Sequence, residues 1–258
     1  MNIFLDIETI PAQDADVIAL LREEAEQEKA AIAAPSNYKD PEKIASYIAE
    51  KTASIDLAFG ERYRKTSLDG AYGQIVCAGV AIDDDAPQVF WQPDWQNGES
   101  AILRALFDYI GSVTRPGNLP TYIGHNVANF DLRFIWQRAA IHGIAPPLRF
   151  PITLSPWDDR VYDTMFEWAG RGQYVSLNKL CRVFGLPGKG DMDGSKVWDY
   201  VQDGRILDVV DYCKQDVARV REIYRRMSFE DSQFATPESE IDPGVISDSA
   251  QEPELALA

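Results

Sequence analysis

The sequence is poor in cysteine and histidine, with three cysteines and two histidines among 258 residues. Three is an odd number and no two cysteines have CxxC spacing, so neither a disulfide framework nor a cysteine zinc site is expected. Long apolar runs are absent too, since no stretch approaches the roughly 20 residues that span a bilayer. The first residues carry acids where a signal peptide carries basic residues. These absences predict a cytoplasmic protein without a membrane partner.

Positive charge is also scarce. Lys and Arg number 25 against 41 Asp and Glu, for a formal net charge of −16. The basic surface of proteins that coat nucleic acid regardless of sequence is therefore missing. The segment after Phe229 is rich in Ser, Pro, Glu and Asp and has no Lys or Arg. We predict that 229–258 is an acidic, disordered tail. An acidic enzyme can still bind an anionic substrate if metal ions supply positive charge.

The remaining composition, 45% hydrophobic and 26% charged, is that of a globular chain with a sizeable core. Hydrophobic periodicity and turn signals predict an α/β domain over 1–228. The predicted strands cover 2–9, 74–82, 87–92, 120–124 and 160–165. The predicted helices cover 15–34, 41–53, 99–113, 130–142, 176–185 and 206–228. The first two helices separate the first two strands, which indicates a helical insertion at 12–69.

Two acids stand out on the first strand. Asp6 and Glu8 are two residues apart in an otherwise apolar segment, so both side chains point to the same face. Acids on a buried strand are costly unless they bind a metal or reach solvent. The pair therefore indicates a metal site, and the alternative is an edge strand with one wet face.

Three further residues extend this pattern. Asp131 follows the fourth strand, where Asn126 or Asn129 is expected to cap the next helix. Tyr212 and Asp216, at i and i+4, project from one face of the last helix. Alone, Asp131 fits any helix N-terminus, and the helix pair fits a boundary tyrosine with a solvated acid. Together with the strand acids, they occur in a consistent order and structural context.

The motifs DxE, N-x-x-x-F-D and Y-x-x-x-D resemble Exo I, Exo II and Exo III of the DEDD superfamily of 3′–5′ exonucleases. Neither His125 nor His142 lies near Asp216 in the sequence, so the resemblance is to the tyrosine branch. The stretch YVSLNKLCRVFGLPGKGDMDG also resembles the predicted exonucleases related to the proofreading domain of family-B DNA polymerases. This resemblance covers 1–11 and 70–228. It implies a ribonuclease H-like fold, a five-stranded mixed sheet flanked by helices with its first three strands antiparallel.

The resemblance also implies a cofactor, two Mg²⁺ or Mn²⁺ ions that clamp the attacking and leaving oxygens of a phosphodiester. Such ions prefer oxygen ligands. By resemblance, Asp6 bridges both ions, while Glu8 and Asp216 complete the one that binds the attacking water. Asp131 holds the second ion, and Tyr212 orients the water.

Substrate contacts are expected from residues near these motifs: Thr9, Ile10, Asn126, Phe130 and Lys189. The implied activity is release of nucleoside monophosphates from the 3′ end of DNA, with single strands preferred. No polymerase domain fits beside this one, so proofreading or DNA repair would place a polymerase or another replication or repair protein in trans. Two alternatives remain, an RNA 3′-end exoribonuclease on the same fold and a non-catalytic nucleic-acid- or protein-binding module.

Overall fold

The computed structural model describes residues 1–117, 119–148, 150–152, 159–170, 172–188, 190 and 192–229. Two expectations fall outside them: the substrate contact of Lys189, and the disordered tail apart from Phe229. Within the described part of the chain, no helix is long and apolar enough to cross a membrane.

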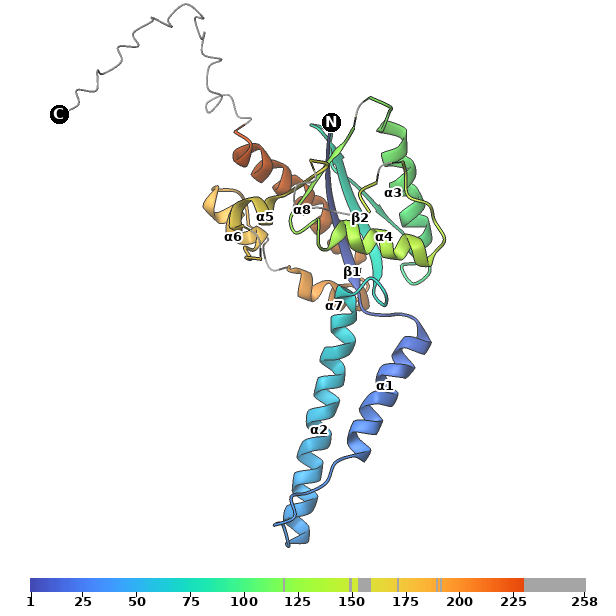
Figure 1. Ribbon diagram of the computed structural model, residues 1–258, viewed down its shortest axis with the longest axis vertical. Coiled ribbons are helices and arrows are strands. Elements are labelled where there is room, and N and C mark those ends of the chain that lie inside the picture. Colours follow the sequence, from blue (N-terminus) through green and yellow to red (C-terminus); the bar gives the residue numbers. More distant parts are fainter. Residues whose placement is uncertain are drawn as a thin grey trace, which may run out of the picture.

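A five-stranded sheet forms the centre of the fold (Figure 1). Its strands are β1 (Asn2–Ile10), β2 (Gln74–Ile82), β3 (Gln88–Trp91), β4 (Thr121–Gly124) and β5 (Val161–Asp163). They lie in the order β3-β2-β1-β4-β5. The first three strands are antiparallel to one another, and β4 and β5 are parallel to β1. This is the mixed, ribonuclease H-like sheet that the motifs imply, and it confirms the predicted fold class.

Helices cover both faces of the sheet, and two others form the insertion after β1. The helices are α1 (Ala15–Ala30), α2 (Pro41–Lys65), α3 (Glu99–Val113), α4 (Asp131–Ile141), α5 (Thr164–Ala169), α6 (Leu177–Val183), α7 (Val197–Gln202) and α8 (Ile206–Met227), with 3-10 turns η1 (Thr66–Leu68) and η2 (Gly194–Lys196). The side chains of β1 show which helices pack on which face, because successive side chains of a strand point to opposite faces. Ile3 and Leu5 join the core cluster containing α3 and α4, and Phe4 joins the one containing α6 and α8.

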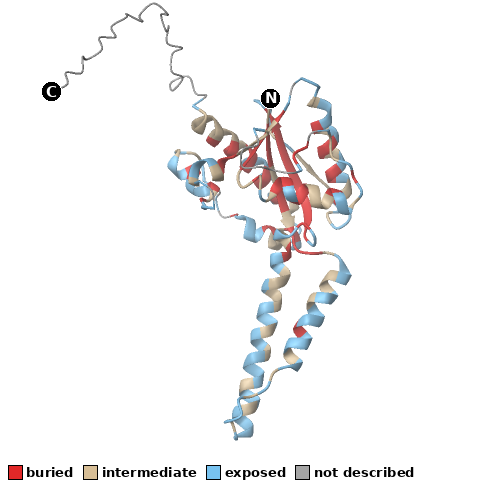
Figure 2. Ribbon diagram, in the orientation of Figure 1, coloured by how far each residue is buried: buried red, intermediate tan, exposed pale blue. Residues whose placement is uncertain are grey.

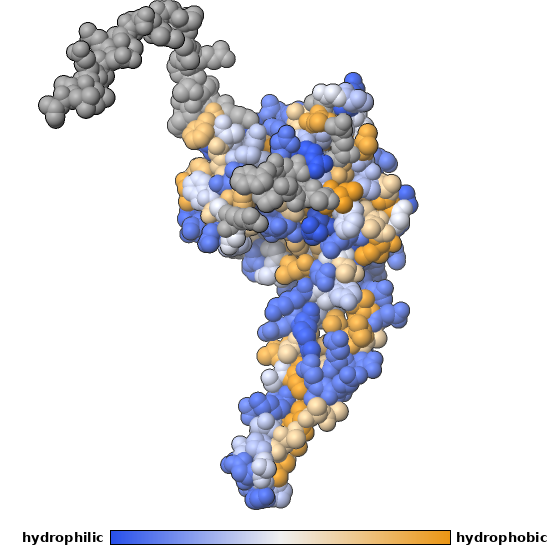
Figure 3. Space-filling model, in the orientation of Figure 1, coloured by the Kyte–Doolittle hydropathy of each residue, from blue (hydrophilic) through white to orange (hydrophobic). Residues whose placement is uncertain are grey.

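The insertion after β1 forms a long helical pair that projects from the body (Figure 1). Asp40 caps α2 with Pro41 in its first turn, as the sequence predicts. The helix continues to Lys65 rather than ending near residue 53, because no proline interrupts it and Gly60 is tolerated inside a helix. No residue of α2 is buried, and in α1 only Ala25 is (Figure 2). Figure 3 shows hydrophilic side chains along much of this pair.

The first strand extends past its neighbour on one side. β4 pairs with Asn2 to Phe4, whereas β2 pairs with Ile3 through Ile10. The segment of β1 that carries Asp6 and Glu8 therefore extends past the residues that pair with β4. This overhang positions the candidate site.

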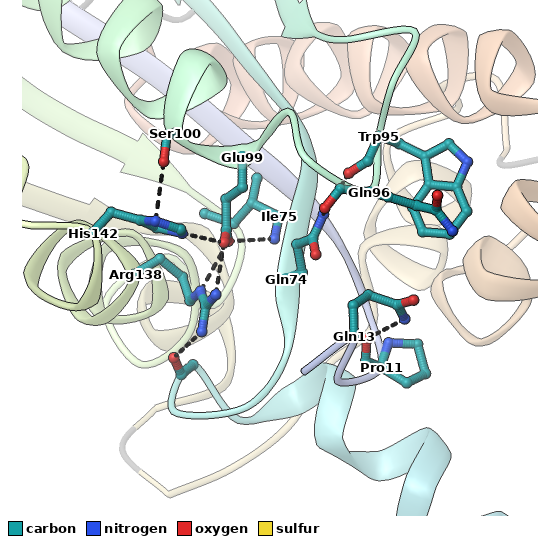
Figure 4. Close-up of polar contacts among 11 residues, drawn as sticks. Pro11, Gln13, Gln74, Ile75, Trp95, Gln96, Glu99, Ser100, Arg138 and His142 are labelled. Carbon is teal, nitrogen blue, oxygen red and sulfur yellow. Dashed lines mark hydrogen bonds and ion pairs between the residues drawn. The ribbon is translucent and has the colours of Figure 1, made fainter. Parts of the chain in front are cut away.

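A buried ionic network holds the C-terminal end of α4 in place (Figure 4). Glu99, 4% exposed, accepts hydrogen bonds from the Ile75 backbone N–H and, in bidentate form, from Arg138. Its Oε2 lies 2.6 Å from Nε2 of His142, and Nδ1 of His142 lies 3.0 Å from Ser100 Oγ. Arg138 neutralises the negative charge of Glu99. Ser100, His142 and Glu99 therefore connect β2, α3 and α4 and have a structural role.

Candidate metal centre

Three carboxylates from the two ends of the chain converge beside the sheet. Asp6 and Glu8 lie on β1, and Asp216 lies on α8. Each offers an oxygen, and these three oxygens lie within 4.8 Å of one another. Glu8 and Asp216 are 7% and 2% exposed, and Asp6 is half-buried. Buried acids at this separation repel one another strongly unless a cation lies between them.

The close approach of α8 to the sheet makes this convergence possible. A Cβ at Gly79 of β2 would lie 2.8 Å from Val217 Cγ2 and 2.9 Å from Cys213 Sγ. Only glycine therefore fits beneath α8 at this point. The Cys213 thiol donates to the Asp6 carbonyl oxygen at 3.6 Å, which links the helix to the strand carrying the acids.

Tyr212 lies beside all three carboxylates. It is 5% exposed, and its hydroxyl hydrogen-bonds to Asp216. Burial, followed by the negative charges of Asp216, Glu8 and Asp6, raises the pKa of the Tyr212 phenol far above its usual value. The side chain is therefore neutral around pH 7 and keeps its O–H donor.

Arg219 holds Asp216 in place. Its Nη1 donates to Asp216 Oδ1 at 2.7 Å, and both side chains are buried. Its remaining nitrogens donate to Gln215 and to the carbonyl oxygens of Pro187 and Gly188. One guanidinium thus connects an acid of the cluster to the loop before α7. Arg219 was not predicted as a site residue, although its spacing three residues after Asp216 on a helix is typical of an ion pair.

Asp131 is attached to the backbone between the two strand acids. It begins α4, is 4% exposed, and its Oδ1 accepts the Ile7 N–H at 2.9 Å. The three-oxygen cluster does not include it. The predicted cap at Asn126 or Asn129 is wrong, because Phe130 occupies the N-cap without a side-chain cap bond.

The turn before α4 is shaped by Asp163 at the end of β5. Asp163 accepts the N–H groups of Asn126 and Ala128 at 2.9 and 3.1 Å. Asn126 has φ of +64°, a left-handed conformation that asparagine tolerates. His125 lies 3.0 Å from Thr164 Oγ1 and 2.8 Å from the carbonyl oxygen of Val175. Asp163 was not predicted as a site residue, because its only signal in the sequence is an acid at a strand end.

The residues expected to contact substrate lie in different surroundings. Thr9 is half-buried, and its Oγ1 donates to the Ser67 carbonyl oxygen at 2.7 Å. Phe130 is half-buried against Phe134 and borders a cavity of about 180 Å³. Asn126 is half-buried in its turn. Ile10 is fully buried in the core cluster that includes α7, so its side chain packs inside the protein.

The mixed sheet with helices on both faces is a ribonuclease H-like fold. Residues 68–242, more than half of the chain, match the family described as predicted 3′–5′ exonucleases related to the exonuclease domain of PolB. The chain belongs to this family. The match begins after β1, so Asp6 and Glu8 lie outside it.

Among solved structures, the chain is similar to the family B DNA polymerase of the hyperthermophilic archaeon Pyrobaculum calidifontis. The two are 17% identical, and the TM-score is 0.48. The alignment covers 62% of this chain but only 22% of the polymerase chain. No curated protein sequence matches this chain.

Proposed function

We propose that this chain is a metal-dependent 3′–5′ exonuclease that releases nucleoside monophosphates from the 3′ end of single-stranded DNA. The observation that carries the proposal is the convergence of Asp6, Glu8 and Asp216, with Tyr212 beside them, in a member of this family. We assign the activity to residues 1–228, with the helical insertion at 12–69.

The donor set fits hard divalent cations, since it consists of carboxylate oxygens without sulfur or histidine. Asp6, Glu8 and Asp216 would hold one Mg²⁺ or Mn²⁺, and Asp6 with Asp131 would hold a second. Two such ions, when bound, stabilise charge on the attacking and leaving oxygens of the phosphodiester.

The protein's own groups position the reactants. Arg219 keeps Asp216 turned toward the strand acids, and the Asp131 bond to the Ile7 N–H fixes α4 against β1. Tyr212, a neutral phenol, would orient the attacking water by hydrogen bonding rather than by taking its proton. Phe130 and Thr9 each line a cavity and would line the path of the substrate strand.

DNA is favoured over RNA because the family is related to the exonuclease domain of a DNA polymerase. We propose that the enzyme acts in the cytoplasm on free 3′ ends, in proofreading or repair with a polymerase in trans. The alternatives are an exoribonuclease and a binding module without activity. A binding module does not need an acid cluster that repels itself, which favours an enzyme.

A gel assay separates these functions. Single-stranded DNA and matched RNA, each labelled at the 5′ end, are incubated with Mg²⁺, Mn²⁺ or EDTA. We expect a ladder shortening from the 3′ end of DNA with either metal and none in EDTA. Asp6→Ala abolishes the ladder, whereas Glu222→Gln, at a half-buried position of α8 outside the carboxylate cluster, leaves it unchanged. Shortening of RNA alone would support the exoribonuclease, and no shortening of either by folded protein would support the binding module.

A further inference from the structure

A second cavity lies at the base of the helical pair. It encloses about 440 Å³ between the end of α2, η1, the end of β1 and the start of α7. Figure 1 shows α7 beside the end of α2 that meets the body. Thr9, which lines the cavity, is the residue that follows Glu8 on β1. The volume is within the range of about 300–1,000 Å³ found for small-molecule sites.

The walls of this cavity are fixed to the strand that carries the acids. The Thr9 hydroxyl donates to the Ser67 carbonyl oxygen, and the Ala12 N–H donates to Thr66 Oγ1 at 2.8 Å. On the opposite side, Arg64 of α2 and Asp199 of α7 form an ion pair of 2.5 Å. The cavity is thus held in one position relative to Asp6 and Glu8.

The lining combines apolar, aromatic and cationic groups. Trp198 is half-buried, with its ring at 83° to that of Trp95 and 5.8 Å away. Leu68 is 67% exposed although it is a large apolar residue. Lys65 adds positive charge in a chain whose net charge is −16, whereas the charge of Arg64 is paired with Asp199. Aromatic rings that stack on bases, next to cations that contact phosphates, are typical of single-stranded nucleic-acid sites.

We propose that this cavity binds a nucleotide of the substrate strand, with its base on Trp198 and Leu68 and a phosphate on Lys65. The inference rests on the proposed function, because it needs a nucleic-acid strand at the metal centre. It also gives the insertion a role. Arg64 and Lys65 belong to its last turn and precede the segment matched by the exonuclease family. The helical pair would thus complete a substrate site.

Binding without hydrolysis tests the inference separately from activity. We would measure fluorescence anisotropy of a short 5′-labelled oligothymidylate with the full chain in EDTA, at several salt concentrations. Trp198→Leu keeps the wall apolar but removes the ring. Because stacking on one aromatic ring contributes about 1–3 kcal/mol, the dissociation constant should rise at least about fivefold. Lys65→Gln should weaken binding and lower the salt dependence by about 0.7 in log–log slope, as one lost phosphate contact does.

Matched controls come from the same chain. Trp168→Leu removes another half-exposed ring, which packs against Phe184 on α6's side of the molecule. Lys51→Gln removes a lysine of α2 further from the sheet. Both should bind like the wild type. If Trp198→Leu disturbs packing on Trp95, the exposed Lys65→Gln still provides the test.

The outcomes distinguish the two proposals. Wild-type affinity in both Trp198→Leu and Lys65→Gln, or equal losses in the controls, would overturn the nucleotide site. A wild type that binds the strand but never shortens it with metal would overturn the proposed activity, while specific losses in the two variants would still support the site. A wild type that does not bind the strand at all would overturn the site.

Discussion

Removing one acid of the cluster should stabilise the metal-free protein and abolish its response to metal. In Asp6→Asn the shape of the side chain is kept and one negative charge is lost. The oxygens of Asp6, Glu8 and Asp216 lie within 4.8 Å of one another, and Arg219 forms an ion pair with Asp216. The substitution therefore relieves chiefly the repulsion between Asp6 and Glu8.

The size of this effect follows from the separation. At an effective dielectric constant of about 20, two like charges 4.8 Å apart repel by about 3.5 kcal/mol. We expect a gain of about 3 kcal/mol in the unfolding free energy, or a rise of about 6–12 °C in Tm for a chain of this size. Wild-type protein should instead gain about 2.7 kcal/mol from Mn²⁺ at 100 times its dissociation constant, or about 5–11 °C.

Thermal melts followed by circular dichroism, in EDTA and with Mn²⁺, measure both effects. Asp6→Asn should melt above the wild type in EDTA and shift little with Mn²⁺. The matched control is Glu222→Gln, which removes an acid of α8 that pairs with Arg225 and should respond to Mn²⁺ like the wild type. If Asp6→Asn melts below the wild type in EDTA and still gains its full shift with Mn²⁺, the acids are not a repelling metal-binding cluster.

Three further predictions follow from single contacts. Burial and nearby acids raise the pKa of Tyr212, so the folded protein keeps the phenol proton and loses stability as the pH rises above about 10. Urea titrations of Tyr212→Phe should therefore show an unfolding free energy that falls less steeply above this pH, by about 1.4 kcal/mol per pH unit. Arg219→Met leaves Asp216 buried without its guanidinium, so urea denaturation in EDTA should show a loss of about 3–5 kcal/mol, and an unchanged midpoint would refute the ion pair. Glu99→Gln leaves Arg138 without its counter-charge and should cost a similar amount while nuclease activity per folded molecule stays at the wild-type level.

Elements with strong local signals could be predicted closely. The strand at 74–82 and the helix at 99–113 have the predicted bounds, because their apolar residues repeat with the period of one structure. The short helices α5 and α7, six residues each, were missed because two turns are too few for a periodic pattern. The cap of α4 was also predicted wrongly. Asn126 instead adopts a left-handed turn that Asp163 holds from another strand.

In the candidate site too, local spacing could be predicted from the sequence, but contacts between distant residues could not. Asp6 and Glu8 could be placed on one face from their spacing, and so could Tyr212 and Asp216. Ile10 looked like a substrate contact from its position after the acids, but the packing of α7 buries it completely. The pairing of Arg219 with Asp216 and the contact of Asp131 with the Ile7 N–H depend on which atoms meet after folding.

By itself, the sequence determined which chemical groups are present, their order, and the local elements that carry them, because strand and helix periodicities are properties of neighbouring residues. The tertiary structure alone decided that residues 6, 8 and 216 meet, since their distance along the chain says nothing about their distance in space. That meeting depends on the overhang of β1 past β4 and on the approach of α8 over Gly79. The cavity at the base of the insertion has the same origin, because its walls come from three separate segments of the chain brought together only by packing.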